Sequence, residues 1–336
     1  MRCELKDSLK FIYADSVVAK APCRSMNIDT ARGGTASVHI LLTDLIKGRT
    51  LRVNLRANGR PVNSGKWFCL VHVPVEVNTG PVGFIEKKGE HNQFTARRAP
   101  FRVYDAIAPC GHLIKISSST MALRLEIPVA RDARTGRREY TLAIQCGKEF
   151  HTLSLAVNIH KPVIPSVGPE SFPYTNWFSF NLMAERHGLK QWTEEHWRMI
   201  RRYADMMGHG RQNTFLCPLR DIFRISGKKP VLDRNRLKRI VKTFTNAGMY
   251  YIEGGHVATR TDGEWNASSF DIRLTGERAT SVQGNKTLAH ICRQLMEEIE
   301  RNKWQERWLQ HVCDEPTQRN ATDYRLLSGM VRRHMP

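Results

Sequence analysis

The sequence predicts two domains of different fold class: an N-terminal antiparallel β-sandwich over residues 1–165, and the first half of a (β/α)8 TIM-type barrel over residues 166–336. Short runs that alternate apolar and polar residues fill the first part, which is typical of half-buried strands. In the second part, short apolar runs typical of buried strands alternate with longer segments whose apolar residues recur at helical spacing. Between them, residues 161–173 contain four prolines and predict a stiff, extended linker.

Seven strands are expected in the sandwich, with turn residues such as Asn58-Gly59 between them. They are residues 37–42, 51–56, 67–73, 113–116, 122–129, 139–144 and 152–159. The stretch 100–110, which contains two prolines, is expected to be a loop that crosses the sandwich. We find no catalytic pattern in this domain.

The second part predicts four βα units. The expected strands are residues 175–182, 213–219, 249–257 and 308–315, and the expected helices are residues 191–208, 233–248, 285–302 and 320–334. Four units are half of a closed barrel, which would need roughly 120–160 more residues at this spacing. The alternatives are an open four-stranded domain or a fragment of a longer protein, and we favour the fragment.

The net charge is +20, which suggests an anionic partner. However, the basic residues are dispersed, and the chain has neither zinc-finger spacing nor an RNA-binding aromatic motif. A nucleic-acid partner is therefore not expected. The charge has no role that the sequence explains.

Eight cysteines occur without a CxxC pair, which argues against a zinc site and predicts buried free thiols in a reducing compartment. The N-terminus lacks an apolar signal core, and no run of eighteen apolar residues exists. We therefore expect a cytoplasmic protein without a membrane partner. No metal or cofactor motif is found.

Two adjacent acids, Asp314 and Glu315, stand where the last expected strand ends, and Pro316 closes the strand because it cannot donate to a sheet. In a βα barrel, the carboxyl ends of the strands carry the chemistry. The plain alternative is a pair of solvated loop acids. Asn181 and His256 are weaker candidates for substrate binding, since each lies in or just after an expected strand.

The chain resembles glycoside hydrolase family 123 and the related DUF4091 group. The resemblance rests on Tyr174-Thr-Asn-Trp-Phe-Ser, on Trp192-Thr-Glu-Glu-His-Trp with His209-Gly-Arg-Gln-Asn-Thr, and on Gln310-His-Val-Cys-Asp-Glu-Pro. Of these motifs, only the last is specific. The resemblance covers most of the chain and implies a β-sandwich followed by a (β/α)8 barrel.

The resemblance also implies a retaining hydrolase of β-linked N-acetylhexosaminides, most often N-acetylgalactosaminides, in which the substrate's acetamido oxygen is the nucleophile. Glu315 would then be the general acid, and Asp314 would orient the acetamido group. No cofactor would be needed. The alternative is a non-catalytic carbohydrate- or polyanion-binding protein, or an inactive truncated remnant.

Overall fold

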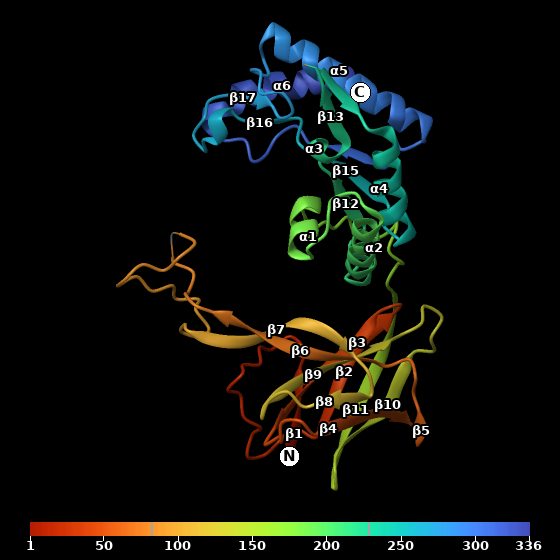
Figure 1. The fold of residues 1–336 in the computed structure, drawn as a ribbon. Helices are drawn as coiled ribbons and strands as arrows, with labels where there is room; N and C mark the ends of the chain where they lie inside the picture. Colours follow the sequence, from red (N-terminus) through yellow and green to blue (C-terminus); the bar gives the residue numbers. More distant parts are fainter. Residues whose placement is uncertain (82, 228) are drawn as a thin grey trace. The chain divides into compact units, whose positions relative to one another are not determined.

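The computed structural model describes residues 1–81, 83–227 and 229–336, and the chain divides into two compact units, Met1–Ile164 and Pro165–Pro336 (Figure 1). Each unit has its own hydrophobic core. Within the described residues, no helix is both long enough and apolar enough to cross a membrane.

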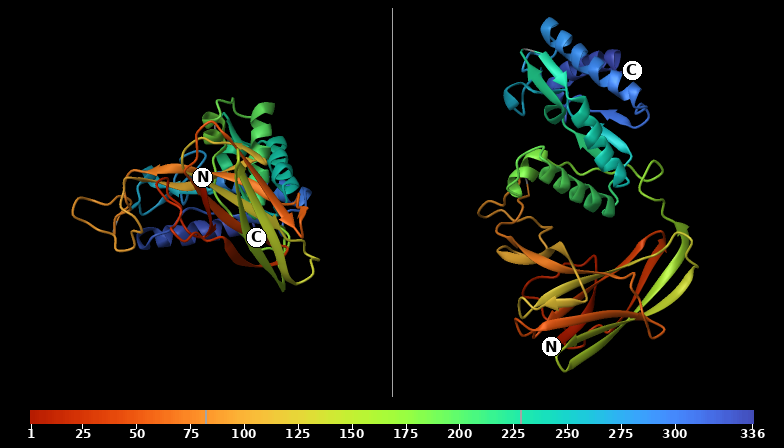
Figure 2. Two further views of the ribbon diagram at one scale, coloured as in Figure 1. Left: turned by 90° about the horizontal axis from the view of Figure 1, so that it is seen from below. Right: turned by 45° about the vertical axis from the view of Figure 1, so that its right-hand side comes forward.

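The N-terminal unit contains two sheets that face each other (Figure 2). The first has the order β1 (Arg2–Asp7), β3 (Thr35–Thr43), β9 (Met121–Pro128), β6 (Lys66–Val75) and β7 (Phe101–Cys110). The second has the order β2 (Ser25–Arg32), β11 (Glu149–Val163), β10 (Gly136–Cys146), β4 (Thr50–Ala57) and β5 (Arg60–Pro61), and β8 (Leu113–Lys115) also pairs with β4. Neighbouring strands are antiparallel except β2 and β11, which are parallel.

The β-rich N-terminal fold predicted from the sequence is confirmed, because alternate residues of both sheets fill one core. Leu51, Val53 and Leu55 of β4 are buried there, as are Val38 and Ile40 of β3. Their neighbours along each strand lie outside this core, which is the period-2 pattern that the sequence shows.

All seven expected strands are present, but β1, β2, β5 and β7 were not predicted. The expectation that residues 100–110 form a loop is wrong: β7 pairs with β6 from Val75 opposite Phe101 to Trp67 opposite Cys110. Pro109 has no backbone N–H to donate to a neighbouring strand. It is tolerated in β7 because this strand lies at the edge of the sheet.

The C-terminal unit is built on a parallel sheet in the order β12 (Thr214–Cys217), β15 (Tyr251–Gly254) and β18 (Trp308–Gln310). Its helices are α1 (Phe180–Arg186), α2 (Glu194–His209), α3 (Leu219–Ile222), α4 (Arg234–Asn246), α5 (Val282–Arg301) and α6 (Ala321–His334). The connections contain β13 (Phe223–Ser226), β14 (Lys229–Leu232), β16 (Ala258–Arg260), β17 (Phe270–Ile272) and two 3-10 turns, η1 (Thr261–Gly263) and η2 (Gln318–Asn320).

Side-chain caps fix where the long helices begin. Thr193 accepts a hydrogen bond from the His196 amide at the start of α2, as the sequence predicts. Asp233 caps α4 and Ser281 caps α5 in the same way. The helices α5 and α6 pack side by side (Figures 1 and 2).

The start of α6 differs from the usual cap. Asn320 occupies the N-cap position, but its side chain accepts from the Thr317 amide and donates to the Ala267 carbonyl instead. The first-turn acid Asp323 accepts from the Phe270 amide at 3.0 Å. These bonds join α6 to the β17 segment, so both side chains stabilise tertiary structure.

The prediction of a first strand at residues 175–182 is wrong. Residues 174–179 have no regular structure, and Ser179 caps the Leu182 amide, so the chain turns into α1 at Phe180. The segment still lies beside β12, since the Tyr174 carbonyl accepts from the Asn213 and Thr214 amides. The parallel sheet therefore has three strands within the described residues.

The two faces of this sheet have different surroundings. Phe215 and Ile252 are fully buried, and the ring of Phe215 stacks on Phe244 of α4 at a centroid distance of 4.9 Å. Leu216, Glu253 and Leu309 share the opposite face because they are aligned in register. Leu309 is 49% exposed, so this face is open at β18.

The carboxyl end of β15 packs against backbone at Gly255. A Cβ atom there would lie 2.8 Å from Pro218 Cα, 3.0 Å from Leu219 N and 3.1 Å from Cys217 O. Backbone atoms cannot move aside as a flexible side chain would, so the position requires glycine.

We expect Gly255→Ala to lower the free energy of unfolding of the C-terminal unit by about 1–3 kcal/mol through overpacking. Gly329→Ala is the matched control: it lies inside α6 with open space around it and should stabilise by about 0.5–1 kcal/mol. Urea denaturation followed by circular dichroism measures both. Equal stability of Gly255→Ala and wild type would contradict the close packing.

Candidate functional site

The carboxyl ends of the three parallel strands meet at one edge of the sheet and surround a recess of about 260 Å³. Pro218 follows β12, His256 follows β15 and Asp314 follows β18, and all three line this space, which we call the Asp314 recess. Trp177, from the irregular segment before α1, lines it as well. The recess thus occupies the position where parallel α/β sheets bind ligands.

The turn after β18 places Asp314 and Glu315 in different surroundings. The side chain of Asp314 is 49% exposed, and its Oδ1 lies 4.0 Å from His256 Nε2. Glu315 is exposed, does not line the recess and has a φ of 32°, where residues other than glycine are uncommon. Arg260 Nη2 donates to the Glu315 carbonyl at 2.6 Å and so fixes this turn.

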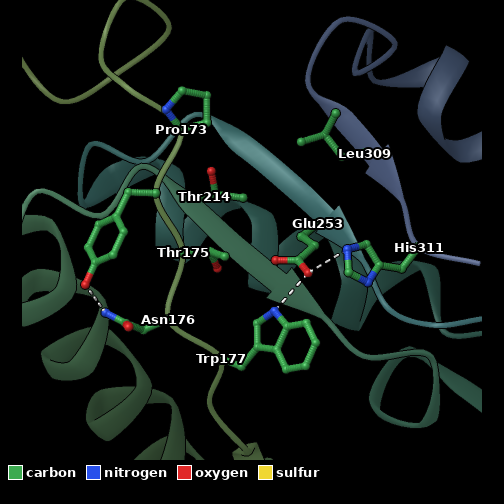
Figure 3. Close-up of a pocket in the computed structure, with 9 residues that line it drawn as sticks. Pro173, Thr175, Asn176, Trp177, Thr214, Glu253, Leu309 and His311 are labelled. Carbon is green, nitrogen blue, oxygen red and sulfur yellow. Dashed lines mark hydrogen bonds and ion pairs between the residues drawn. The ribbon is translucent and has the colours of Figure 1, made fainter. Parts of the chain in front are cut away.

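A buried carboxylate, Glu253 of β15, lies beside this pair and was not predicted as a site residue. It is 4% exposed. Trp177 Nε1 donates to its Oε1 at 2.9 Å, and His311 Nε2 lies 3.2 Å from the same oxygen (Figure 3). Its Oε2 has no hydrogen-bond partner among the described residues. Glu253 therefore holds two aromatic side chains from different segments.

The chain of contacts continues from His311 to His256, whose Nε2 lies 2.8 Å from His311 Nδ1. A neutral imidazole has one N–H and one acceptor nitrogen. In the contact between the two rings, one nitrogen therefore donates and the other accepts. The two imidazoles thus connect the buried acid to the Asp314 recess.

Burial lowers the pKa of His256 to about 4, and the neighbouring His311 and Arg273 act in the same direction, while Asp314 opposes them. His256 is therefore neutral at pH 7 and faces Asp314 as a dipole rather than as a cation. Its separation of 4.0 Å from Asp314 exceeds hydrogen-bond length.

A second, larger cavity of about 570 Å³ lies on the open face of the sheet, and we call it the Glu253 groove (Figure 3). Thr214, Glu253, Leu309 and His311 line it from the sheet side, and residues 173–177 line it from the other. Trp177, which is 52% exposed, borders both the groove and the recess. An exposed indole beside polar groups is a suitable surface for stacking a sugar ring.

The structure brings together some of the candidates from the sequence. His256 and Asp314 line the recess, and Glu315 follows Asp314 outside it. Asn181 is exposed on α1 and lines neither cavity, because the helix that replaces the expected strand changes its direction. A Cβ atom on Gly254 or Gly255 would meet protein atoms, and Gly255 also lines the recess.

Sequence reasoning missed Glu253 and did not select Trp177 or His311 as site residues. The available signal was the position of Glu253 at the end of an apolar strand, the same position that singled out Asp314. Within the described residues, no group of three or more His, Cys, Asp or Glu side chains has an arrangement that could hold a metal ion. All eight cysteines are free, and Cys23, Cys69 and Cys110 are only half-buried.

No protein-family model and no curated protein sequence matches the chain. Among solved structures, a family 123 glycoside hydrolase from Clostridium perfringens, studied for glycolipid glycan hydrolysis, superposes with a TM-score of 0.67 at 10% sequence identity. The fold is similar to that of this glycoside hydrolase. The match covers 97% of this chain and 61% of the hydrolase, so the chain spans less than two thirds of its length.

A putative alpha-galactosidase from Bacteroides fragilis is a weaker match, with a TM-score of 0.27 at 11% identity over 92% of this chain and 48% of that protein. The fimbrial subunit MyfA from Yersinia enterocolitica, solved with galactose, matches 48% of this chain and all of its own at a TM-score of 0.23 and 8% identity. These two scores are too low to support an argument.

We expect the imidazole proton resonances of His256 to titrate with a midpoint near pH 4 in the folded protein, because burial disfavours its charged form. In urea, the same histidine should titrate near about 6.5. Since the unfolded chain binds more protons between these values, this histidine makes the fold less stable as pH falls through that window.

Asp314→Asn should lower the His256 midpoint further, because it removes the one neighbour that raises it. NMR titration of wild type and variant measures both values. A folded-state midpoint at or above that of the unfolded chain would contradict the assignment of a buried, neutral His256.

Proposed function

We propose that the chain is a glycoside hydrolase that acts on β-linked N-acetylhexosaminides, in particular N-acetylgalactosaminides, with retention of configuration. The observation that carries the proposal is the position of Asp314, which follows the carboxyl end of a parallel strand and lines a recess there together with a neutral histidine. The likeness in fold to a family 123 glycoside hydrolase supports it.

In the proposed mechanism, the substrate's acetamido oxygen attacks the anomeric carbon, so the protein supplies no nucleophile. Glu315, in its protonated form, donates a proton to the leaving oxygen and later activates the water that opens the oxazoline. Asp314 accepts a hydrogen bond from the acetamido N–H and stabilises its developing positive charge. No step requires a metal or cofactor.

The neighbouring side chains supply orientation. The neutral His256 places a dipole beside Asp314 without forming an ion pair, so the carboxylate stays available to the acetamido group. Trp177, held by Glu253, provides a ring surface at the entrance to both cavities. We propose that the sheet forms the first strands of a (β/α)8-type barrel, in which the open face of Leu216, Glu253 and Leu309 points inward.

Glu315→Gln should reduce release of the aryl group from an aryl N-acetyl-β-galactosaminide by on the order of 10²–10⁴-fold, the usual contribution of general acid catalysis. Asp314→Asn should cause a similar loss. Glu306→Gln, which neutralises an exposed acid in the segment before β18, is the matched control and should retain activity. The assay uses the protein at its full natural length, and undiminished activity of Glu315→Gln would reject the assignment.

The acetamido group should be essential, because it acts as the nucleophile. An aryl β-galactoside with a hydroxyl at C2 should not be cleaved by the wild-type protein, whereas the N-acetyl compound should be cleaved with its β configuration retained in the first product. NMR of the fresh product measures the configuration. Equal cleavage of both substrates would show that an enzymic nucleophile acts instead.

A further inference from the structure

The Asp314 recess carries more positive than negative charge. Arg260 and Arg273 both line it, while Asp314 is the single carboxylate among its described lining residues. His256 adds no charge at neutral pH, because burial lowers its pKa to about 4. Two guanidinium groups thus face one half-exposed acid.

The guanidinium of Arg260 is engaged through Nη2 and its planar face, although its Nε has no hydrogen-bond partner among the described residues. Its Nη2 donates to the Glu315 carbonyl, and the group lies over the Trp265 ring at 4.2 Å from the ring centroid. Through these contacts, Arg260 stabilises the turn that carries Asp314 and Glu315.

Arg273 is different, since its side chain forms no hydrogen bond or ion pair among the described residues. Its backbone is fixed, because its amide donates to the Val257 carbonyl at 2.9 Å and its carbonyl accepts from Arg220 Nη2 at 3.4 Å. Burial and the nearby Arg220 lower its pKa, and Asp314 opposes them only in part. A half-buried cation beside a second cation is unfavourable unless an anion joins it.

We propose that the Asp314 recess binds an anionic substituent of the sugar substrate, a carboxylate or a sulfate ester, through Arg273. This inference rests on the proposed function and specifies its substrate class as acidic N-acetylhexosaminides. The planar guanidinium presents paired N–H donors that match two oxygens of either group. Asp314 remains free for the acetamido group of the same sugar.

The test compares binding of three probes to the full-length protein by isothermal titration calorimetry at low salt: a neutral methyl N-acetyl-β-galactosaminide, its sulfate ester, and a β-linked N-acetylgalactosamine disaccharide that bears a uronic acid. At least one anionic probe should bind about 10- to 100-fold more tightly than the neutral one, the range of a charge-assisted hydrogen bond. The tighter of the two identifies the anion as sulfate or carboxylate.

Arg273→Met should remove this preference, so that the anionic probes no longer bind more tightly than the neutral one. Arg325→Met, which removes an exposed charge from α6 that does not line the recess, is the matched control and should retain the preference. Arg273→Lys should keep part of it, because the charge remains but the paired donors are lost. Thermal unfolding of each variant checks that the fold is intact, and if Arg273→Met is unfolded, Arg273→Gln replaces it.

Equal affinity for all three probes, or a preference that survives in a folded Arg273 variant, would overturn the inference. Cleavage of the neutral glycoside in that case would leave the proposed function standing. Conversely, tight binding of the sulfated sugar with loss in Arg273→Met, but without cleavage of any β-N-acetylhexosaminide, would support the anion site and reject the hydrolase.

Discussion

The arrangement of the candidate site depends on the buried carboxylate of Glu253. This side chain is 4% exposed, accepts a hydrogen bond from Trp177 and lies 3.2 Å from His311 Nε2, so residues of two other segments hold it in place. Through His311 the constraint reaches His256, which lines the recess with Asp314. One acid on the central strand therefore orients aromatic groups on both sides of it.

The sheet separates structural and chemical roles between its two faces. The face of Phe215 and Ile252 is sealed by helical side chains, which fixes the positions of the strands. The opposite face and the carboxyl edge carry the polar groups. Because the packed face fixes the backbone, Glu253 Oε2 can lack a hydrogen-bond partner among the described residues without loss of the fold.

Much of this architecture could be predicted from the sequence, and the errors have physical causes. Alternation revealed β3, β4, β9, β10 and β11, since half-buried strands require it. The edge strand β7 was missed because Pro109 is typical of loops. Residues 175–182 have strand-like composition, but Ser179 caps a helix there. Asp314 was found from its place at a strand end, whereas Glu253 gains its role only when folding brings Trp177, 76 residues earlier, within hydrogen-bond distance.

The bond between Trp177 and Glu253 also has a spectroscopic consequence. Trp67, Trp197 and Trp304 are buried in apolar cores, whereas Trp177 and Trp265 are 52% and 55% exposed, and Trp177 forms T-shaped contacts with two imidazoles. Its intrinsic fluorescence therefore depends on the solvent and on the protonation of its neighbours. A ligand that enters either cavity displaces water from this indole, so the molecule contains its own optical reporter of occupancy.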